Sequence, residues 1–314
     1  MKKLSFKWVL PIMAMPMLMA SCNSDEPYPE VAEYVTIDRV GVGELQSRSE
    51  ISATNNLLNS KAHIQLWFDS GKDDARYNAT RMHWSCNGSS WSTSEVLLWG
   101  GGSAKYIALC SDKSWGNYDG EWKFGWQEFI DDYRFSINSS ALSTMSVKSA
   151  WPDILVAQGT ATSSSLNLKF SHALAKVKIN TNIPTSESYS SVGATMYNLC
   201  TGAECSVSVT DGLKFYLENQ SLYQQFFVSD NTGEYYTFET LVIPQSANDL
   251  TIKISLYNQG NSTDYIVKFD NTQTFESGKI YEYDVVLGDS KAELENVTVS
   301  EWDDEVNAGN FVTE

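Results

Sequence analysis

The feature that most constrains the fold is a two-residue alternation of apolar and polar side chains, repeated along the chain. Residues 166–170, 175–179 and 250–256 show it clearly. Successive side chains of a strand point to opposite faces, so the alternation predicts strands with one face packed inward and the other in solvent. Turns rich in Gly, Asn and Ser separate the strands, which indicates an all-β protein made of β-sandwiches. Further strands are expected at residues 35–37, 39–42, 63–68, 106–109, 281–287 and 297–299, and one or two helical turns at 128–133.

Length and composition predict two domains. Without a leader of residues 1–21 the chain keeps 293 residues, which is more than one small sandwich requires. Eight of the ten tryptophans lie between Trp67 and Trp151, and a serine-rich run follows at 162–165. We therefore expect a signal peptide at 1–21, a tether at 22–30, a tryptophan-rich sandwich at 31–162 and a second sandwich at 163–314.

The first 22 residues predict export and lipid attachment. Three lysines, an apolar run at 9–20 and small residues directly before Cys22 have the layout of a signal peptide, and the run is too short to span a bilayer well. Residues 17–22 resemble a bacterial lipobox, in which the cysteine is acylated, and several acyl chains hold a protein durably. The acidic residues after Cys22 resemble a surface-export signal. These features favour an outer membrane lipoprotein at the cell surface; the alternative is an ordinary secreted protein.

Charge and cysteine usage narrow the partners and the chemistry. Loss of the three leader lysines changes the formal net charge from −17 to −20, which disfavours nucleic acid and anionic lipid as partners. The four remaining cysteines fall into two pairs, and the oxidising compartment allows two disulfides, with free thiols as the alternative. The short second pair would close a tight turn at 201–204. A zinc site is disfavoured because no close CxxC pair is present. The candidate disulfides are Cys86–Cys110 and Cys200–Cys205.

No pattern in the chain predicts an enzyme, a metal site or a cofactor. There is no nucleophile elbow, no HExxH and no P-loop. The tryptophan-rich half allows two interpretations: exposed indoles that stack on a glycan, or indoles that fill the core. The candidates for glycan stacking are Trp84, Trp91, Trp99, Trp115, Trp122 and Trp126.

Several segments of the second half resemble the fimbrillin family of Bacteroidetes. Residues 168–177 resemble that family's F-x-H-x-L-A-x-V strand, and 241–245 its I-P-Q element. Residues 275–283 resemble F-x-x-G-K-x-Y-x-Y, and 297–302 the closing strand with tryptophan. The resemblance covers residues 154–302 well and the tryptophan-rich half poorly.

The resemblance implies two tandem transthyretin-like sandwiches in a fimbrial subunit. Family members travel as lipoproteins, a trypsin-like protease cuts after an arginine, and the vacated groove accepts a strand from a neighbouring subunit. The candidate cut here is Arg48–Ser49, with Arg39 as second choice, which would remove the strand at about 34–42. The expected partners are other fimbrial subunits, the outer membrane through lipid on Cys22, and a host or bacterial glycan or protein receptor. The alternative is a surface lipoprotein that binds glycan without polymerising.

Overall fold

The computed structural model describes most of the chain after residue 32, and all of these residues belong to one compact unit, Glu33–Glu314. The described residues are 33–42, 63–86, 90–111, 116–118, 121–123, 127–129, 132–138, 154–184, 189–231, 234–288 and 291–302.

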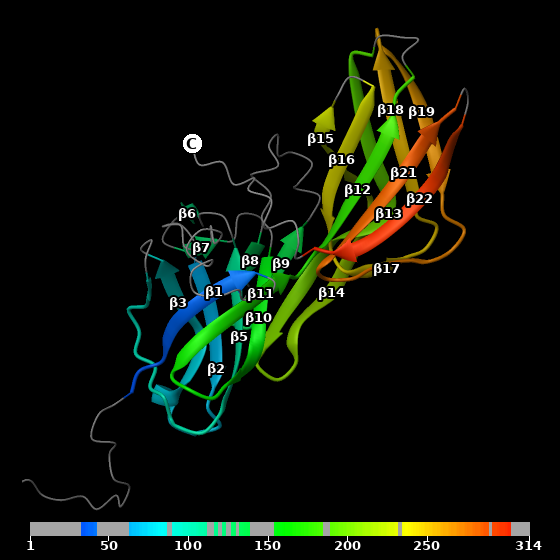
Figure 1. Cartoon of the computed structure of the whole chain (residues 1–314). Helices are drawn as coiled ribbons and strands as arrows, with labels where there is room; N and C mark the ends of the chain where they lie inside the picture. The colour runs from blue at the N-terminus through cyan, green and yellow to red at the C-terminus, as the bar shows by residue number, and fades with distance from the viewer. Residues whose placement is uncertain are drawn as a thin grey trace, which may run out of the picture. The chain divides into compact units, whose positions relative to one another are not determined.

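The predicted all-β class is confirmed, and each predicted strand segment overlaps a strand of the structure (Figure 1). A seven-stranded sheet has the order β1 (Thr36–Val42), β11 (Ser165–His172), β10 (Ile154–Ala161), β5 (Ala104–Ser111), β2 (His63–Asp69), β3 (Asn78–Cys86) and β4 (Trp91–Ser92). A five-stranded sheet has the order β15 (Phe227–Asn231), β16 (Tyr235–Val242), β12 (Ala175–Asn182), β21 (Lys279–Leu287) and β22 (Ala292–Glu301).

The third large sheet has six strands. Its order is β19 (Asn261–Lys268), β18 (Thr251–Asn258), β13 (Ser191–Ser208), β9 (Arg134–Asn138) and β8 (Gln127–Phe129), and β14 (Gly212–Gln225) pairs with β13. Two small two-stranded sheets complete the set: β17 (Gln245–Ala247) with β20 (Gln273–Phe275), and β6 (Gly116–Tyr118) with β7 (Glu121–Lys123). A single turn of 3₁₀ helix, η2, spans Ala75–Tyr77.

Apolar side chains form three buried clusters. The first is enclosed by the seven-stranded sheet and includes Leu66, Trp84 and Phe170. The second lies between the five- and six-stranded sheets, with Val177 and Ile254 as members. The third combines side chains from all three large sheets. Inward positions predicted from alternation, such as Leu168, Val177 and Ile254, are members of these clusters.

Two sets of strand pairings cross a domain boundary placed at residue 162. β11 pairs antiparallel with β10 and parallel with β1, so the serine-rich run at 162–164 connects two strands of one sheet. β9 pairs antiparallel with the C-terminal part of β13. The division into two domains stays a prediction.

The predicted helical turns at 128–133 are wrong at their start. Glu128 and Phe129 belong to β8, where they pair with Ser136 and Phe135 of β9. Sheet pairing supplies hydrogen-bond partners for the backbone over this segment, and a single helical turn would leave most of them unsatisfied.

Tyr283 carries a buried hydroxyl that has no hydrogen-bond partner among the described residues, and burial raises its pKa. Replacement of Tyr283 with Phe is therefore expected to raise the free energy of unfolding by about 1–2 kcal/mol, because it removes an unsatisfied polar atom. Tyr281→Phe is the matched control: the Tyr281 hydroxyl accepts the Glu276 N–H at 2.9 Å, so its loss is expected to be destabilising. Urea unfolding checks both, and equal losses for the two variants would contradict the assignment.

Candidate functional site

The first strand closes the seven-stranded sheet upon itself. On one side β1 pairs in parallel with β11, from Thr36 opposite Ser165 to Val42 opposite Phe170, and Figure 1 shows the two strands together. On the other side β1 lies alongside β4, at the opposite edge of the same sheet. The curled sheet is thus closed by the strand that the sequence predicts to be removable.

Backbone hydrogen bonds fasten the start of β1 to a second segment. The Val35 N–H donates to the Leu97 carbonyl at 2.9 Å, and the Trp99 N–H donates to the Glu33 carbonyl at 2.8 Å. Tyr34 and Leu98 form an antiparallel bridge between these two bonds. The start of β1 is therefore paired on both sides, as in the interior of a sheet.

The inner face of β1 is aliphatic. Val35, Ile37 and Val40 are each at most 7% exposed and belong to the first buried cluster. A register shift between Ile37 and Arg39 inserts an extra residue, so that Val40 points inward although it is three positions after Ile37. Each fully buried aliphatic side chain stabilises the docked strand by roughly 1.5–3 kcal/mol.

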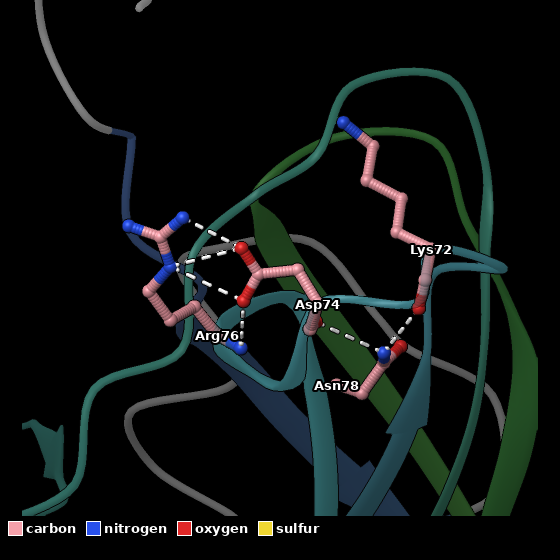
Figure 2. Close-up of polar contacts among 4 residues, drawn as sticks. All are labelled: Lys72, Asp74, Arg76 and Asn78. Carbon is pink, nitrogen blue, oxygen red and sulfur yellow. Dashed lines mark hydrogen bonds and ion pairs between the residues drawn. The ribbon is translucent and has the colours of Figure 1, made fainter. Parts of the chain in front are cut away.

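A loop between β2 and β3 supports the segment that pairs with β1. Figure 2 shows Asp74 accepting the Arg76 backbone N–H at 2.9 Å and also bonding the Arg76 guanidinium. These two interactions hold the pKa of Asp74 down at about 2. Asn78 Nδ2 donates to the carbonyls of Lys72 and Asp74. The Arg76 carbonyl in turn accepts the Leu98 N–H at 2.8 Å, so the loop positions the residue that bridges to Tyr34.

The predicted lipidation and cleavage residues lie largely outside the described part of the chain. Cys22, Arg48 and Ser49 are among the residues without a description, and Arg48 falls between β1 and β2. Arg39, the second choice, lies within β1 opposite Asn167 and is half-buried. Because a protease needs an accessible extended loop, this position favours Arg48, and the cut stays a prediction.

The two cysteine pairs do not form disulfides in the structure. Cys200 and Cys205 lie in one continuous strand, β13, so the predicted tight turn at 201–204 is wrong and the two residues are roughly 17 Å apart along the strand. Cys86 and Cys110 lie on β3 and β5, which flank β2. Two strand spacings separate their backbones by roughly 10 Å, beyond the reach of a disulfide.

Two of the six candidate tryptophans, Trp84 and Trp91, fill the core, and glycan stacking by the others stays a prediction. Trp84 and Trp91 are 3% and 8% exposed and belong to the first buried cluster. Trp99 is partly buried and packs its edge against Phe68, with ring centroids 6.3 Å apart. Trp122 lies in β7, and Trp115 and Trp126 lie outside the described residues. Stacking on a sugar needs an exposed indole face, which Trp84 and Trp91 do not have.

The structure brings together two histidines that lie far apart in the sequence. His63 Nδ1 and His83 Nε2 are 2.9 Å apart on the neighbouring strands β2 and β3. Partial burial, with a smaller effect of His83, lowers the pKa of His63 to about 4, and burial also lowers the pKa of His83. The alternation of Met82, Trp84 and Cys86, which indicates a strand around His83, was the available sequence signal, but it does not specify the pairing with β2. Within the described ranges, no group of three or more His, Cys, Asp or Glu side chains could hold a metal ion.

Stability is expected to fall as the pH drops from 6.5 to 4, because the unfolded chain then binds a proton at His63 that the folded chain does not. Above pH 6.5 the effect is constant. Allowing for solvent screening at a half-exposed site, the loss is about 1–2 kcal/mol. Urea unfolding of the wild type and His63→Asn across this range isolates the contribution. Parallel pH profiles would contradict it.

No helix of the described chain is long and apolar enough to span a membrane. A comparison with the curated proteins finds no significant match. Among solved structures, a candidate cell adhesion protein of Bacteroides ovatus is 17% identical, covers 88% of this chain and 99% of its own, and has a TM-score of 0.56. A similar protein of Bacteroides uniformis is 13% identical, covers 78% and 92%, and has a TM-score of 0.54. These likenesses support the fold.

A weaker likeness links the chain to the tip fimbrial protein Mfa3 of Porphyromonas gingivalis, at 11% identity, 77% and 94% coverage and a TM-score of 0.43. The sequence model of the fimbrillin-like family matches residues 131–302, which include β9 to β22. That match spans more than half of the chain, and the chain therefore belongs to the fimbrillin-like family.

Proposed function

We propose that the chain is a structural subunit of a bacterial cell-surface fimbrium, assembled by strand donation and acting in adhesion. Membership of the fimbrillin-like family supports a fimbrial role. The observation that carries the mechanism is β1, a strand with an aliphatic inner face that closes a curled sheet and precedes the candidate cut at Arg48.

The order of events follows from the position of the cut. The precursor is exported and tethered by lipid on Cys22, with β1 seated between β11 and β4. Cleavage after Arg48 would leave β1 covalently attached only to the lipidated N-terminal segment. When β1 leaves, it exposes the free edge of β11 and the apolar side chains beneath. An incoming strand from another subunit restores both the backbone hydrogen bonds and the apolar contacts.

The same geometry defines the proposed location and partners. Before cleavage the chain is an outer membrane lipoprotein at the cell surface, and after cleavage it is part of a fimbrium. If the cut does not occur, Cys22 makes the subunit a permanent anchor. Other fimbrial subunits are the main partners, and a host or bacterial glycan or protein is the receptor. Burial of Trp84 and Trp91 gives the non-polymerising glycan binder no structural support.

Brief trypsin treatment of the chain from Cys22 onward tests the proposal. We expect one early cut after Arg48, followed by a ladder of oligomers on a non-denaturing gel. Arg48→Gln is expected to abolish both the cut and the ladders. Arg134→Gln is the matched control, since Arg134 lies in β9 and pairs with Glu204 at 3.2 Å. A chain that is cut after Arg48 yet stays monomeric would overturn strand donation, and ladders from Arg48→Gln would overturn the assignment of the cut.

A further inference from the structure

Two buried indole N–H groups lie in the core that β1 covers. Trp84 and Trp91 are more than nine-tenths buried, and neither Nε1 has a hydrogen-bond acceptor among the residues that the structure describes. Trp67 shows the usual arrangement, because its Nε1 donates to the Asp132 carbonyl at 2.8 Å. A buried donor that loses its hydration without gaining an acceptor carries an uncompensated desolvation cost. Two such donors in one core therefore indicate a position where an acceptor would bind favourably.

The two donors lie on the side of the core next to β1. Trp91 belongs to β4, which runs alongside β1, and it pairs with Cys86, two residues after Trp84 on the same face of β3. At the antiparallel Tyr34–Leu98 bridge, the segment that leads from Trp91 to Leu98 runs in the direction opposite to the segment that enters β1. Val40, which is 1% exposed, belongs to the same buried cluster as Trp84 and Trp91, and β4 contacts β1.

Native β1 cannot satisfy these donors. The described inward side chains, Val35 directly before β1 and Ile37 and Val40 within it, are aliphatic and contain no hydrogen-bond acceptor. The backbone of β1 pairs with β11, and the carbonyls of a paired strand lie in the plane of the sheet and not toward the core. β1 therefore fills the groove with apolar side chains and leaves the two indole N–H groups of the groove without an acceptor.

We infer that the groove selects an incoming strand that carries an acceptor side chain, such as Ser, Thr or Asn, where β1 carries Val40. The inference rests on the proposed function and specifies the partner: a strand of another subunit with an otherwise alternating aliphatic face and one polar residue at this register. Such a strand makes the same apolar contacts as β1 and also binds an indole N–H. β1 is then the weaker occupant, which favours exchange in the direction of assembly.

A double-mutant cycle in the full chain tests the contact without any exchange step. Val40→Thr places a hydroxyl of nearly the same shape on β1, and Trp91→Phe or Trp84→Phe removes a donor. Val40→Thr is expected to raise the equilibrium constant for unfolding. We expect that factor to be about 3–10-fold smaller when both tryptophans are present than in one of the Phe backgrounds. Val177→Thr, at a buried valine of β12 in the second cluster, is the matched control and should show no such dependence. An equal cost of Val40→Thr in all backgrounds would overturn the inference.

Two further measurements keep the result interpretable. If a Phe variant does not fold, the indole Nε1–H resonances of the full-length Val40→Thr variant decide: one of them should exchange with solvent more slowly than in the wild type, and unchanged exchange counts against the contact.

Synthetic peptides of residues 34–42, with and without Val40→Thr, are then offered to the trypsin-cut chain. Binding several-fold tighter for the Thr peptide supports the inference, and equal binding overturns it while strand exchange stands. If neither peptide displaces β1, the proposed function fails, and the cycle still decides the contact.

Discussion

Replacement of Glu239 with alanine is expected to lower the free energy of unfolding by about 3–5 kcal/mol. Lys176 Nζ lies 3.3 Å from Glu239 Oε2, and the two side chains are only 5% and 6% exposed. They come from the adjacent strands β12 and β16 of the five-stranded sheet. Removal of the carboxylate takes away the negative charge 3.3 Å from a buried ammonium, so less of the desolvation cost of that ammonium is compensated.

The Arg134–Glu204 pair provides the matched control. Its nitrogen–oxygen distance is 3.2 Å, but the side chains are 47% and 29% exposed. Glu204→Ala is expected to cost no more than about 1 kcal/mol, because water screens the pair. The double variant Lys176→Met with Glu239→Leu should recover most of the loss, since apolar side chains of similar volume replace both charges. Guanidinium unfolding measures all three, and equal costs for Glu239→Ala and Glu204→Ala would show that Lys176 is not isolated by burial.

The strands could be predicted from the sequence because alternation is a local property. Each segment chosen for its two-residue period overlaps a strand, and β11 shows the expected inward and outward pattern. β12 differs, because it is buried on both faces, including the polar side chain of Lys176. The pairing of strands could not be predicted, because it depends on contacts between residues far apart in the chain. β1 lies parallel to β11 across more than 120 residues of sequence, and nothing in either segment specifies the other.

Two errors at the site have identifiable causes. The pair Cys200 and Cys205 suggested a turn by spacing alone, whereas the buried positions 199, 201, 203, 205 and 207 continue one alternation through β13. That period was the available signal, and it is stronger than cysteine spacing. The tryptophan cluster was ambiguous because composition does not assign faces. The alternation of Met82, Trp84 and Cys86 places Trp84 inward, as the structure shows.

The first strand, which we propose is removable, was predicted at nearly its observed position, but the way it is held was not. Its aliphatic residues predict a strand at this position. The register shift after Ile37 and the hydrogen bonds to the 97–99 segment arise only when the sheet curls. Closure depends on Arg76 and Asn78 of a polar loop, whose residues carry no periodic signal. Local pattern therefore identifies the strand, and long-range contacts define its groove.

Replacement of Trp302 with alanine is expected to cost about 3–5 kcal/mol of unfolding free energy and to release the end of β22 first. Trp302 is 7% exposed, and its ring stacks on His172 with centroids 3.9 Å apart and planes at 7°. Lys176 Nζ lies 5.8 Å from the ring centroid, and the Trp302 backbone N–H donates to the Gly278 carbonyl at 2.9 Å. Side chains of β11 and β12 thus meet at one indole, and a backbone bond fixes the residue that carries it.

The C-terminal half of β22 depends most on this contact. Among the described strands β22 is an edge strand that pairs with β21, and Val297 and Val299 are 42% and 53% exposed, whereas Ala292 and Leu294 at its start pack against the second buried cluster. Hydrogen exchange should therefore accelerate in β22 of Trp302→Ala before it does in β12, which lies in the middle of the same sheet. Trp302→Phe is the control, since it keeps a ring against His172 and should retain most of the stability. If Trp302→Ala leaves β22 as protected as in the wild type, the indole does not anchor the strand, and pairing with β21 alone holds it in place.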